Sequence, residues 1–178
     1  YLFPRAHAVA YVMMAFRIAW FKVYHPLAFY AAYFSIRAKA FDLRIMTGDL
    51  KTQMTEFNRI KALDRGASPK DKDLMSALEV SMEMYQRGYR FVNVDIQHSE
   101  ARRFSIKDGA LLPPFLAIDS LGETVADAIV AEREERPFTS LKDLQRRCKV
   151  SNTIIDLMKE LKCCGELPED EQMSLFGA

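Results

Sequence analysis

The chain has 178 residues, of which 49% are hydrophobic and 28% charged, and its formal net charge is +1. This length and apolar content exclude a disordered chain and suit one ordinary domain or two small ones. The three cysteines show no Cys-x-x-Cys spacing, so a disulfide framework is excluded and reduced thiols in a cytoplasmic protein are predicted. We expect no signal peptide or membrane segment, because no apolar run of about twenty uncharged residues is present.

Charge is distributed unevenly along the chain. Residues 1–60 carry eight Lys or Arg against three Asp or Glu, whereas residues 166–178 carry four acids and no base. The basic part of the chain suits a polyanionic ligand. The acidic tail would be repelled by that ligand and would remain available to another partner. Because the first residue is Tyr1 rather than Met, we expect a fragment of a longer polypeptide.

The first part of the chain predicts helices. Apolar residues recur at helical spacing over residues 4–24, and Pro26 suits the first position of a second helix, which continues to residue 38. Asp49 is expected to cap a third helix that runs to about Asp64. The apolar face of this third helix would consist of Leu50, Met54, Phe57, Ile60 and Leu63.

The fourth helix has the clearest signals. Ser68 is its N-cap, Pro69 its first residue and Asp71 completes a capping box, while Gly88 ends it. Asp71 and Asp73 have the spacing of a metal-binding carboxylate pair, but Asp is expected in a first turn for capping and dipole reasons, so no metal site is predicted. The expected buried stripe is Leu74, Leu78, Met82 and Tyr85.

The hydrophobic period then changes from 3.6 to 2. Residues 92–96 alternate apolar and polar side chains, which predicts a strand, and Asp108-Gly109 predicts the tight turn of a hairpin. Short helices follow. We expect them over residues 123–136, 141–147 and 154–163, with Ser140 and Asp143 as a second capping box, Ser151 as an N-cap and Gly165 as the last stop.

Residues 116–129 resemble a helix-hairpin-helix element, with an apolar entry, a turn closing on Gly122 and a helix after it. Free backbone N–H groups at such a helix start can hold a DNA phosphate without reading a base. This chain has Ser120, beside the acidic Asp119, where the family has its first glycine, and the alternative is a helical bundle in which Gly122 only makes a turn. The candidate DNA-binding residues are Ser120, Leu121, Gly122, Glu123 and Thr124, with Lys149 and Ser151 in a second hairpin that lacks glycine.

The N-terminal block is rich in aromatic and basic residues. On a helix His7 and Tyr11 share one face, and Arg5 stands before them at the positive helix end. Such a set could grip a triphosphate and stack on a nucleobase. The alternative is that these aromatic residues belong to a core.

The tail predicts a docking peptide. Leu175 and Phe176 suit an apolar cleft of a partner, and the Gln172 amide could fix the register through hydrogen bonds. Together with Ser174 these residues resemble the clamp-binding peptide of bacterial DNA-processing enzymes. The alternative is a terminus that folds its apolar residues back onto the domain.

Taken in order, these blocks resemble the bacterial DNA polymerase III alpha subunit of the PolC type. The resemblance implies that the incoming nucleotide lies near a set of fingers residues, and that Arg17 and Lys22 are available to phosphates or template. It also implies palm carboxylates outside this sequence that hold two Mg²⁺ ions, and usually an exonuclease upstream. The fingers set would be Tyr1, Phe3, Arg5, His7 and Tyr11.

We therefore expect a mainly α fold with a small β unit (α+β). Its parts would be the helical fingers (1–88), a strand and hairpin unit (89–112), the helix-hairpin-helix region (113–165) and a clamp-binding tail (166–178). The expected function is part of a replicative DNA-directed DNA polymerase, inactive alone and without catalytic or metal-binding residues of its own. Its partners would be primer–template duplex DNA, dNTP, the sliding clamp (beta subunit) and other replisome proteins.

Two alternatives remain at this point. One is a stand-alone helix-hairpin-helix DNA-binding module of a repair or recombination protein with a clamp-binding peptide, which leaves the N-terminal block unexplained. The other is a structural helical protein with no nucleic-acid role, which predicts no salt-dependent binding to DNA.

Overall fold

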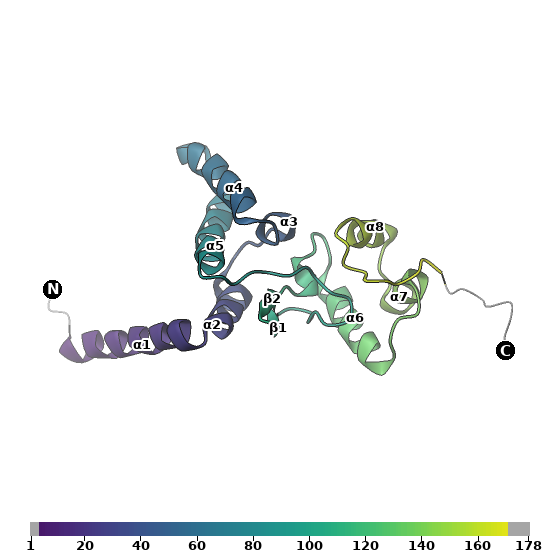
Figure 1. Cartoon of the computed structure of the whole chain (residues 1–178), viewed down its shortest axis with the longest axis horizontal. Coiled ribbons are helices and arrows are strands. Elements are labelled where there is room, and N and C mark those ends of the chain that lie inside the picture. Colours follow the sequence, from purple (N-terminus) through teal and green to yellow (C-terminus); the bar gives the residue numbers. More distant parts are fainter. Residues whose placement is uncertain (1–3, 171–178) are drawn as a thin grey trace.

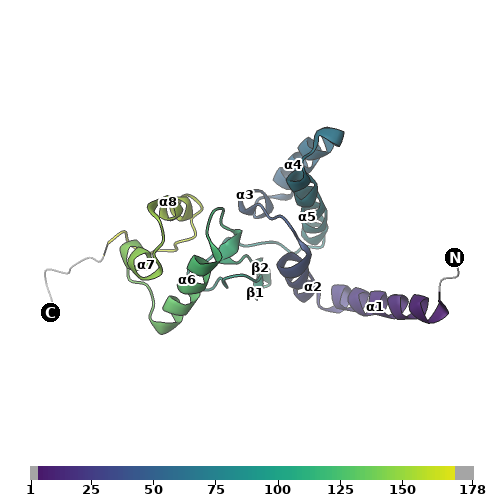
Figure 2. The ribbon, with the colours of Figure 1, turned by 180° about the vertical axis from the view of Figure 1, so that it is seen from behind.

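The structure is a computed structural model that describes residues 4–170. The molecule is elongated, with α1 projecting at one end, α6 to α8 at the other and the hairpin between them (Figures 1 and 2). This confirms the expected mainly α fold with a small β unit. The elements are α1 (Arg5–Tyr24), α2 (Pro26–Ala32), a π-helical turn (Tyr33–Arg37), α3 (Leu43–Met46), α4 (Leu50–Ala62), α5 (Pro69–Gln86), β1 (Ser105–Lys107), β2 (Ala110–Leu112), α6 (Glu123–Glu135), α7 (Leu141–Cys148) and α8 (Asn152–Glu160), with 3-10 turns at Asp64–Gly66 and Phe115–Ala117.

Helix α1 packs little against the rest of the described chain. None of its residues is buried, and Phe16 is 73% exposed. Its C-terminal end is held by an ion pair of 2.8 Å between Lys22 Nζ and Glu83 Oε2. By length and composition alone α1 would also suffice to cross a membrane, so the expectation of no membrane segment, which rests on its charged residues, stays a prediction.

The predicted helix starts are confirmed by their hydrogen bonds. The Thr52 N–H donates to Asp49 Oδ1 at 2.7 Å. Ser68 and Asp71 form both halves of a capping box, at 3.1 and 3.0 Å. The Asp71 carboxylate is therefore engaged by the start of its own helix, as a capping residue should be.

Two predicted helix faces are wrong in detail. Met54 of α4 and Leu63, which caps the end of α4, are exposed, whereas Gln53 of α4 is fully buried. Its Oε1 accepts a hydrogen bond of 2.6 Å from the Ser81 hydroxyl of α5, and α5 buries Ser81 while Met82 remains half-buried. The two helices thus pack through a satisfied polar pair, which apolar periodicity does not reveal.

The strand predicted over residues 92–96 is wrong. Pairing there is limited to a single bridge between Phe91 and Leu111. The side chains of Asn93 and Asp95 accept hydrogen bonds from nearby backbone N–H groups, at 2.9 and 2.8 Å. These local bonds replace the ladder of a sheet.

The predicted hairpin is confirmed. β1 and β2 pair antiparallel, with Ile106 opposite Leu111. The turn residues Asp108 and Gly109 have φ of 50° and 75°. Two successive positive φ values are typical of the turn that matches strand twist, and glycine adopts them without strain.

The helix-hairpin-helix region has its own core, distinct from that of α2 to α5. Its fully buried residues include Phe115, Ile118, Ala126, Ile129, Leu144 and Met158. The last helix ends at Glu160, earlier than predicted, because Lys162 is left-handed (φ 55°) and the Cys163 N–H bonds back to Met158 O at 2.9 Å. This bond closes a Schellman motif before Gly165 is reached.

The three cysteines are buried and free, and their reduced state stays a prediction. Burial raises the pKa of the Cys148 thiol to about 11 and that of Cys163 to about 12. Thiols in this state react slowly, so these cysteines act as packing residues.

Candidate nucleic-acid interface

The two hairpins have the same backbone geometry. Ser120 and Lys149, which begin the two turns, are both left-handed, with φ of 63° and 55°. The next residue is buried in each case: Leu121 is 5% exposed and Val150 3%. The two turns therefore match residue by residue, as expected for the predicted tandem hairpins. Neither left-handed position has the glycine that favours this backbone conformation.

In each turn, the residue after this buried one is the N-cap of a helix. Gly122, before α6, has φ −76° and ψ 156°, and Ser151, before α8, has φ −69° and ψ 155°. Ser151 Oγ accepts a hydrogen bond from the Ile154 N–H at 3.4 Å. Gly122 has no side chain to do the same, so the first N–H groups of α6 are left for solvent or a ligand.

The fold itself does not require glycine at position 122. Its φ is negative, and no atom lies within 4 Å of the place that a Cβ would occupy. Serine would be the better cap there. A bare N-cap in open space gives a ligand close access to the backbone of α6.

Arg102 neutralises acids beside the first hairpin. Its Nη1 lies 2.6 Å from Glu123 Oε2, and its Nε donates to Asp127 Oδ1 at 3.1 Å. The hydrogen bond from Arg102 holds the pKa of the Asp127 carboxyl below its usual value. Arg102 was not among the predicted residues, because no local signal connects it to residues more than twenty positions later.

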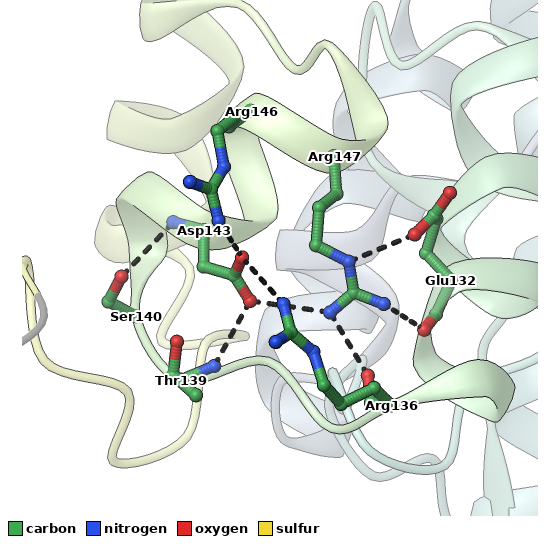
Figure 3. A network of polar contacts seen from close by, with 7 residues as sticks. All are labelled: Glu132, Arg136, Thr139, Ser140, Asp143, Arg146 and Arg147. Atoms are coloured by element: carbon green, nitrogen blue, oxygen red, sulfur yellow. Dashed lines mark hydrogen bonds and ion pairs between the residues drawn. The ribbon is translucent and has the colours of Figure 1, made fainter.

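Asp143 is the centre of a polar network between the two hairpins (Figure 3). Its buried carboxylate accepts from Arg146 Nη2 at 2.9 Å, Arg147 Nη1 at 3.3 Å and the Thr139 N–H at 3.3 Å. Burial acts to raise the pKa of Asp143, but these hydrogen bonds outweigh it and the pKa is lowered. The predicted capping box is thus only half formed: Ser140 Oγ accepts from the Asp143 N–H, while the Asp143 carboxylate turns to the arginines.

Arg147 extends this network to α6. Its Nε donates to Glu132 Oε2 at 2.9 Å and its Nη1 to the Arg136 carbonyl at 3.1 Å. Its guanidinium also lies over the Phe138 ring, 4.7 Å from the centroid. These contacts fix α7 against α6, and hence the second hairpin against the first.

The nucleotide-binding candidates are only partly described. Arg5, His7 and Tyr11 lie on α1, and the rings of His7 and Tyr11 are 4.4 Å apart in an edge-on arrangement. This is the shared face expected from their spacing, and their contact with a nucleotide stays a prediction. Tyr1 and Phe3, and all four tail residues Gln172, Ser174, Leu175 and Phe176, lie outside the described residues.

The DNA-binding candidates divide by exposure. Leu121 is buried, so only its backbone can face a ligand, whereas Ser120, Gly122, Thr124 and Lys149 are exposed. Glu123 is exposed and paired with Arg102. Lys142 and Arg146, which are exposed and four residues apart on α7, were not among the candidates.

Within residues 4–170 no group of three or more His, Cys, Asp or Glu side chains could hold a metal ion.

Comparison with known proteins gives two findings. The helix-hairpin-helix motif family matches residues 88–172. The chain is 48% identical over 176 residues to DNA polymerase III PolC-type of Caldanaerobacter subterraneus subsp. tengcongensis, and 49% identical over 179 residues to that of Streptococcus suis. Each match covers 99% of this chain but only 13% and 12% of the relative, so the chain spans about an eighth of their length. The chain therefore belongs to the PolC-type DNA polymerase III family, as the resemblance of its sequence blocks indicated.

Proposed function

We propose that this chain is the part of a replicative DNA-directed DNA polymerase that grips product duplex DNA and tethers the enzyme. The observation that carries the proposal is the pair of hairpins with matching geometry, of which the first offers an uncapped helix start at Gly122. Backbone N–H groups at such a start bind phosphates and carry no base information. A polymerase needs a grip of this kind, because it must hold any sequence that it has copied.

The remaining blocks have roles in the same enzyme. Arg5, His7 and Tyr11 of α1 would contact the incoming dNTP, together with Tyr1 and Phe3. The apolar residues of α1, none of which is buried, support a neighbour outside this chain, since such a surface is normally covered. Mg²⁺ and its carboxylate ligands would belong to that outer part, so the fragment alone would not polymerise.

The tail would bind the sliding clamp through Gln172, Ser174, Leu175 and Phe176. A weak duplex grip and a weak clamp contact on one chain give a high effective concentration at the primer end, and hence processive synthesis. Such an enzyme works in the cytoplasm beside other replisome proteins. The stand-alone repair module leaves α1 unexplained, whereas the PolC-type relatives match this helix as well as the hairpins.

The test is duplex binding by fluorescence anisotropy, with Gly122→Thr as the decisive variant. The space around Gly122 accepts the new side chain, and threonine can cap α6, so stability should be unchanged or higher. Duplex affinity should fall about tenfold if a phosphate approaches this backbone, because the loss of a charge-assisted bond costs about 1.5 kcal/mol or more.

Gly66→Thr is the matched control, since position 66 is also open and lies far along the chain. Wild type and control should bind with the same affinity, a steep salt dependence and no sequence preference. Wild-type affinity in Gly122→Thr would contradict a phosphate contact at the first hairpin. A strong preference for one duplex sequence would contradict non-specific grip.

A further inference from the structure

A basic stripe runs along the exposed face of α7. Lys142 and Arg146 are four residues apart in α7, which places them on one side of the helix, and Lys149 follows directly as the left-handed C-cap of α7. The side chains of Lys142 and Arg146 are 68% and 70% exposed. The stripe leads from the start of α7 to the turn of the second hairpin, over about 10 Å. Duplex DNA rises about 3.4 Å along its axis for each nucleotide of one strand, so a stripe of this length can reach more than one phosphate of that strand.

The surroundings make this stripe the basic face of the region. Acidic residues outnumber basic ones over residues 113–170, and exposed acids such as Glu134 and Glu135 occupy the end of α6. Asp143 is the acid of α7, and its side chain is fully buried. Since acidic surfaces repel duplex DNA, the stripe is a favourable place for DNA to contact the second hairpin.

Arg146 is already oriented for an anion. Its Nη2 is tied to Asp143 Oδ1 at 2.9 Å, and a guanidinium has five N–H donors, so most of them remain for another acceptor. Figure 3 shows that the rest of this guanidinium points away from the network. Lys142, Gln145, Arg146 and Asp170 border one polar hollow of about 480 Å³, which has room for a phosphate group.

The segment before the tail covers one end of the stripe. Asp170 Oδ2 lies 2.5 Å from Lys142 Nζ. The backbone behind it is held to the start of α7, because the Leu141 and Lys142 N–H groups donate to the carbonyls of Pro168 and Glu169, at 2.9 and 3.2 Å. Asp170 thus occupies the position that a phosphate would take on Lys142.

We infer that Lys142, Arg146 and Lys149 bind successive phosphates of one strand of duplex DNA, and that Asp170 competes with DNA for Lys142. This inference rests on the proposed function and adds a second contact, separate from the helix start at Gly122. It also means that Asp170, in the segment before the tail, lowers the affinity of the chain for duplex DNA.

The first experiment replaces the stripe residues singly by glutamine and measures duplex affinity at several salt concentrations. Lys142→Gln and Lys149→Gln should each weaken binding about three- to tenfold near 0.1 M salt and reduce the slope of log affinity against log salt by about 0.9. Arg146→Gln should weaken binding and reduce the slope in the same way. The folding of this variant is checked separately, because Arg146 contacts Asp143. Lys61→Gln and Arg65→Gln, which remove exposed charges at the end of α4, should change neither quantity.

The second experiment is a double-mutant cycle between Asp170 and Lys142. Asp170→Asn should strengthen binding about two- to threefold in the wild type and leave it unchanged in Lys142→Gln. Equal strengthening in both backgrounds would overturn the competition.

The outcomes also separate this inference from the proposed function. Wild-type affinity in Lys142→Gln and Lys149→Gln, with loss in Gly122→Thr, would overturn the stripe and leave the hairpin grip in place. Absence of salt-dependent duplex binding by the wild type would overturn both.

Discussion

Ser120 and Lys149 occupy the same position in two successive hairpins, and both have positive φ, 63° and 55°. Each is followed by one buried residue and then by the N-cap of a helix. A residue other than glycine in the left-handed region costs about 1 kcal/mol or more. The chain therefore tolerates strain at two equivalent points in order to start α6 and α8 in the same way.

Ser120→Gly should stabilise the protein. Relief of the left-handed strain outweighs the greater freedom of glycine in the unfolded chain, so the free energy of unfolding should rise by about 0.5 kcal/mol. Asp119→Gly is the control, because position 119 has no positive φ and glycine there should lower stability by a similar amount. Urea unfolding measures both, and destabilisation by Ser120→Gly would refute the strain.

Asp143→Asn should destabilise the helix-hairpin-helix region by about 2 kcal/mol. The variant keeps the shape of the side chain but removes the charge that pairs with Arg146 and Arg147. Arg147, whose side chain is only 11% exposed, then has Glu132 as its remaining partner in this network. Asp156→Asn, on the exposed side of α8, should change stability by less than about 0.5 kcal/mol. Equal losses of stability in the two variants, measured by chemical denaturation, would show that the Asp143 network does not stabilise the fold.

The same carboxylate predicts a dependence on pH. The pKa of Asp143 is lowered in the folded protein, so its stabilisation is present above the ordinary pKa of an aspartate and is lost as pH falls through the lowered value. The stability difference between wild type and Asp143→Asn should be constant near neutral pH and shrink below about pH 4. A difference that stays constant into strong acid would exclude an ionised Asp143 as its source.

The exposed apolar surface of α1 predicts that the chain self-associates, and Phe16→Glu should reduce this association without loss of stability. Phe16 is 73% exposed on a helix that buries no residue, so its removal costs no core contact, while a charge interrupts the apolar surface. Sedimentation velocity should show fewer oligomers, with the unfolding free energy unchanged within about 0.5 kcal/mol. Ser76→Glu, an equal charge at an exposed position of α5, should leave association as in the wild type.

The tail prediction is tested by binding to a purified bacterial sliding clamp. Gln172→Ala and Phe176→Ala should each abolish clamp binding, because one removes the register-fixing amide and the other an apolar anchor. Duplex affinity should stay at the wild-type value in both. Unaltered clamp affinity in the two variants would refute the docking peptide.

The sequence by itself determined the features whose physics is local. The capping residues Asp49, Ser68 and Ser151, the Asp108-Gly109 turn and the shared face of His7 and Tyr11 all depend on residues within four positions of one another. Over so short a range, the reach of a hydrogen bond and the preference of certain residues for the left-handed region allow few alternative conformations. The sequence blocks were also specific enough to identify the family.

Only the tertiary structure decided the features that join distant residues. Gln53 is buried because Ser81 of another helix satisfies it, and Arg102 reaches Glu123 across twenty-one positions. Arg147 connects the buried Asp143 to Glu132 of α6, fifteen positions earlier in the chain. The energy of a polar group depends on which partners packing brings within about 3 Å, and a linear pattern does not contain that distance.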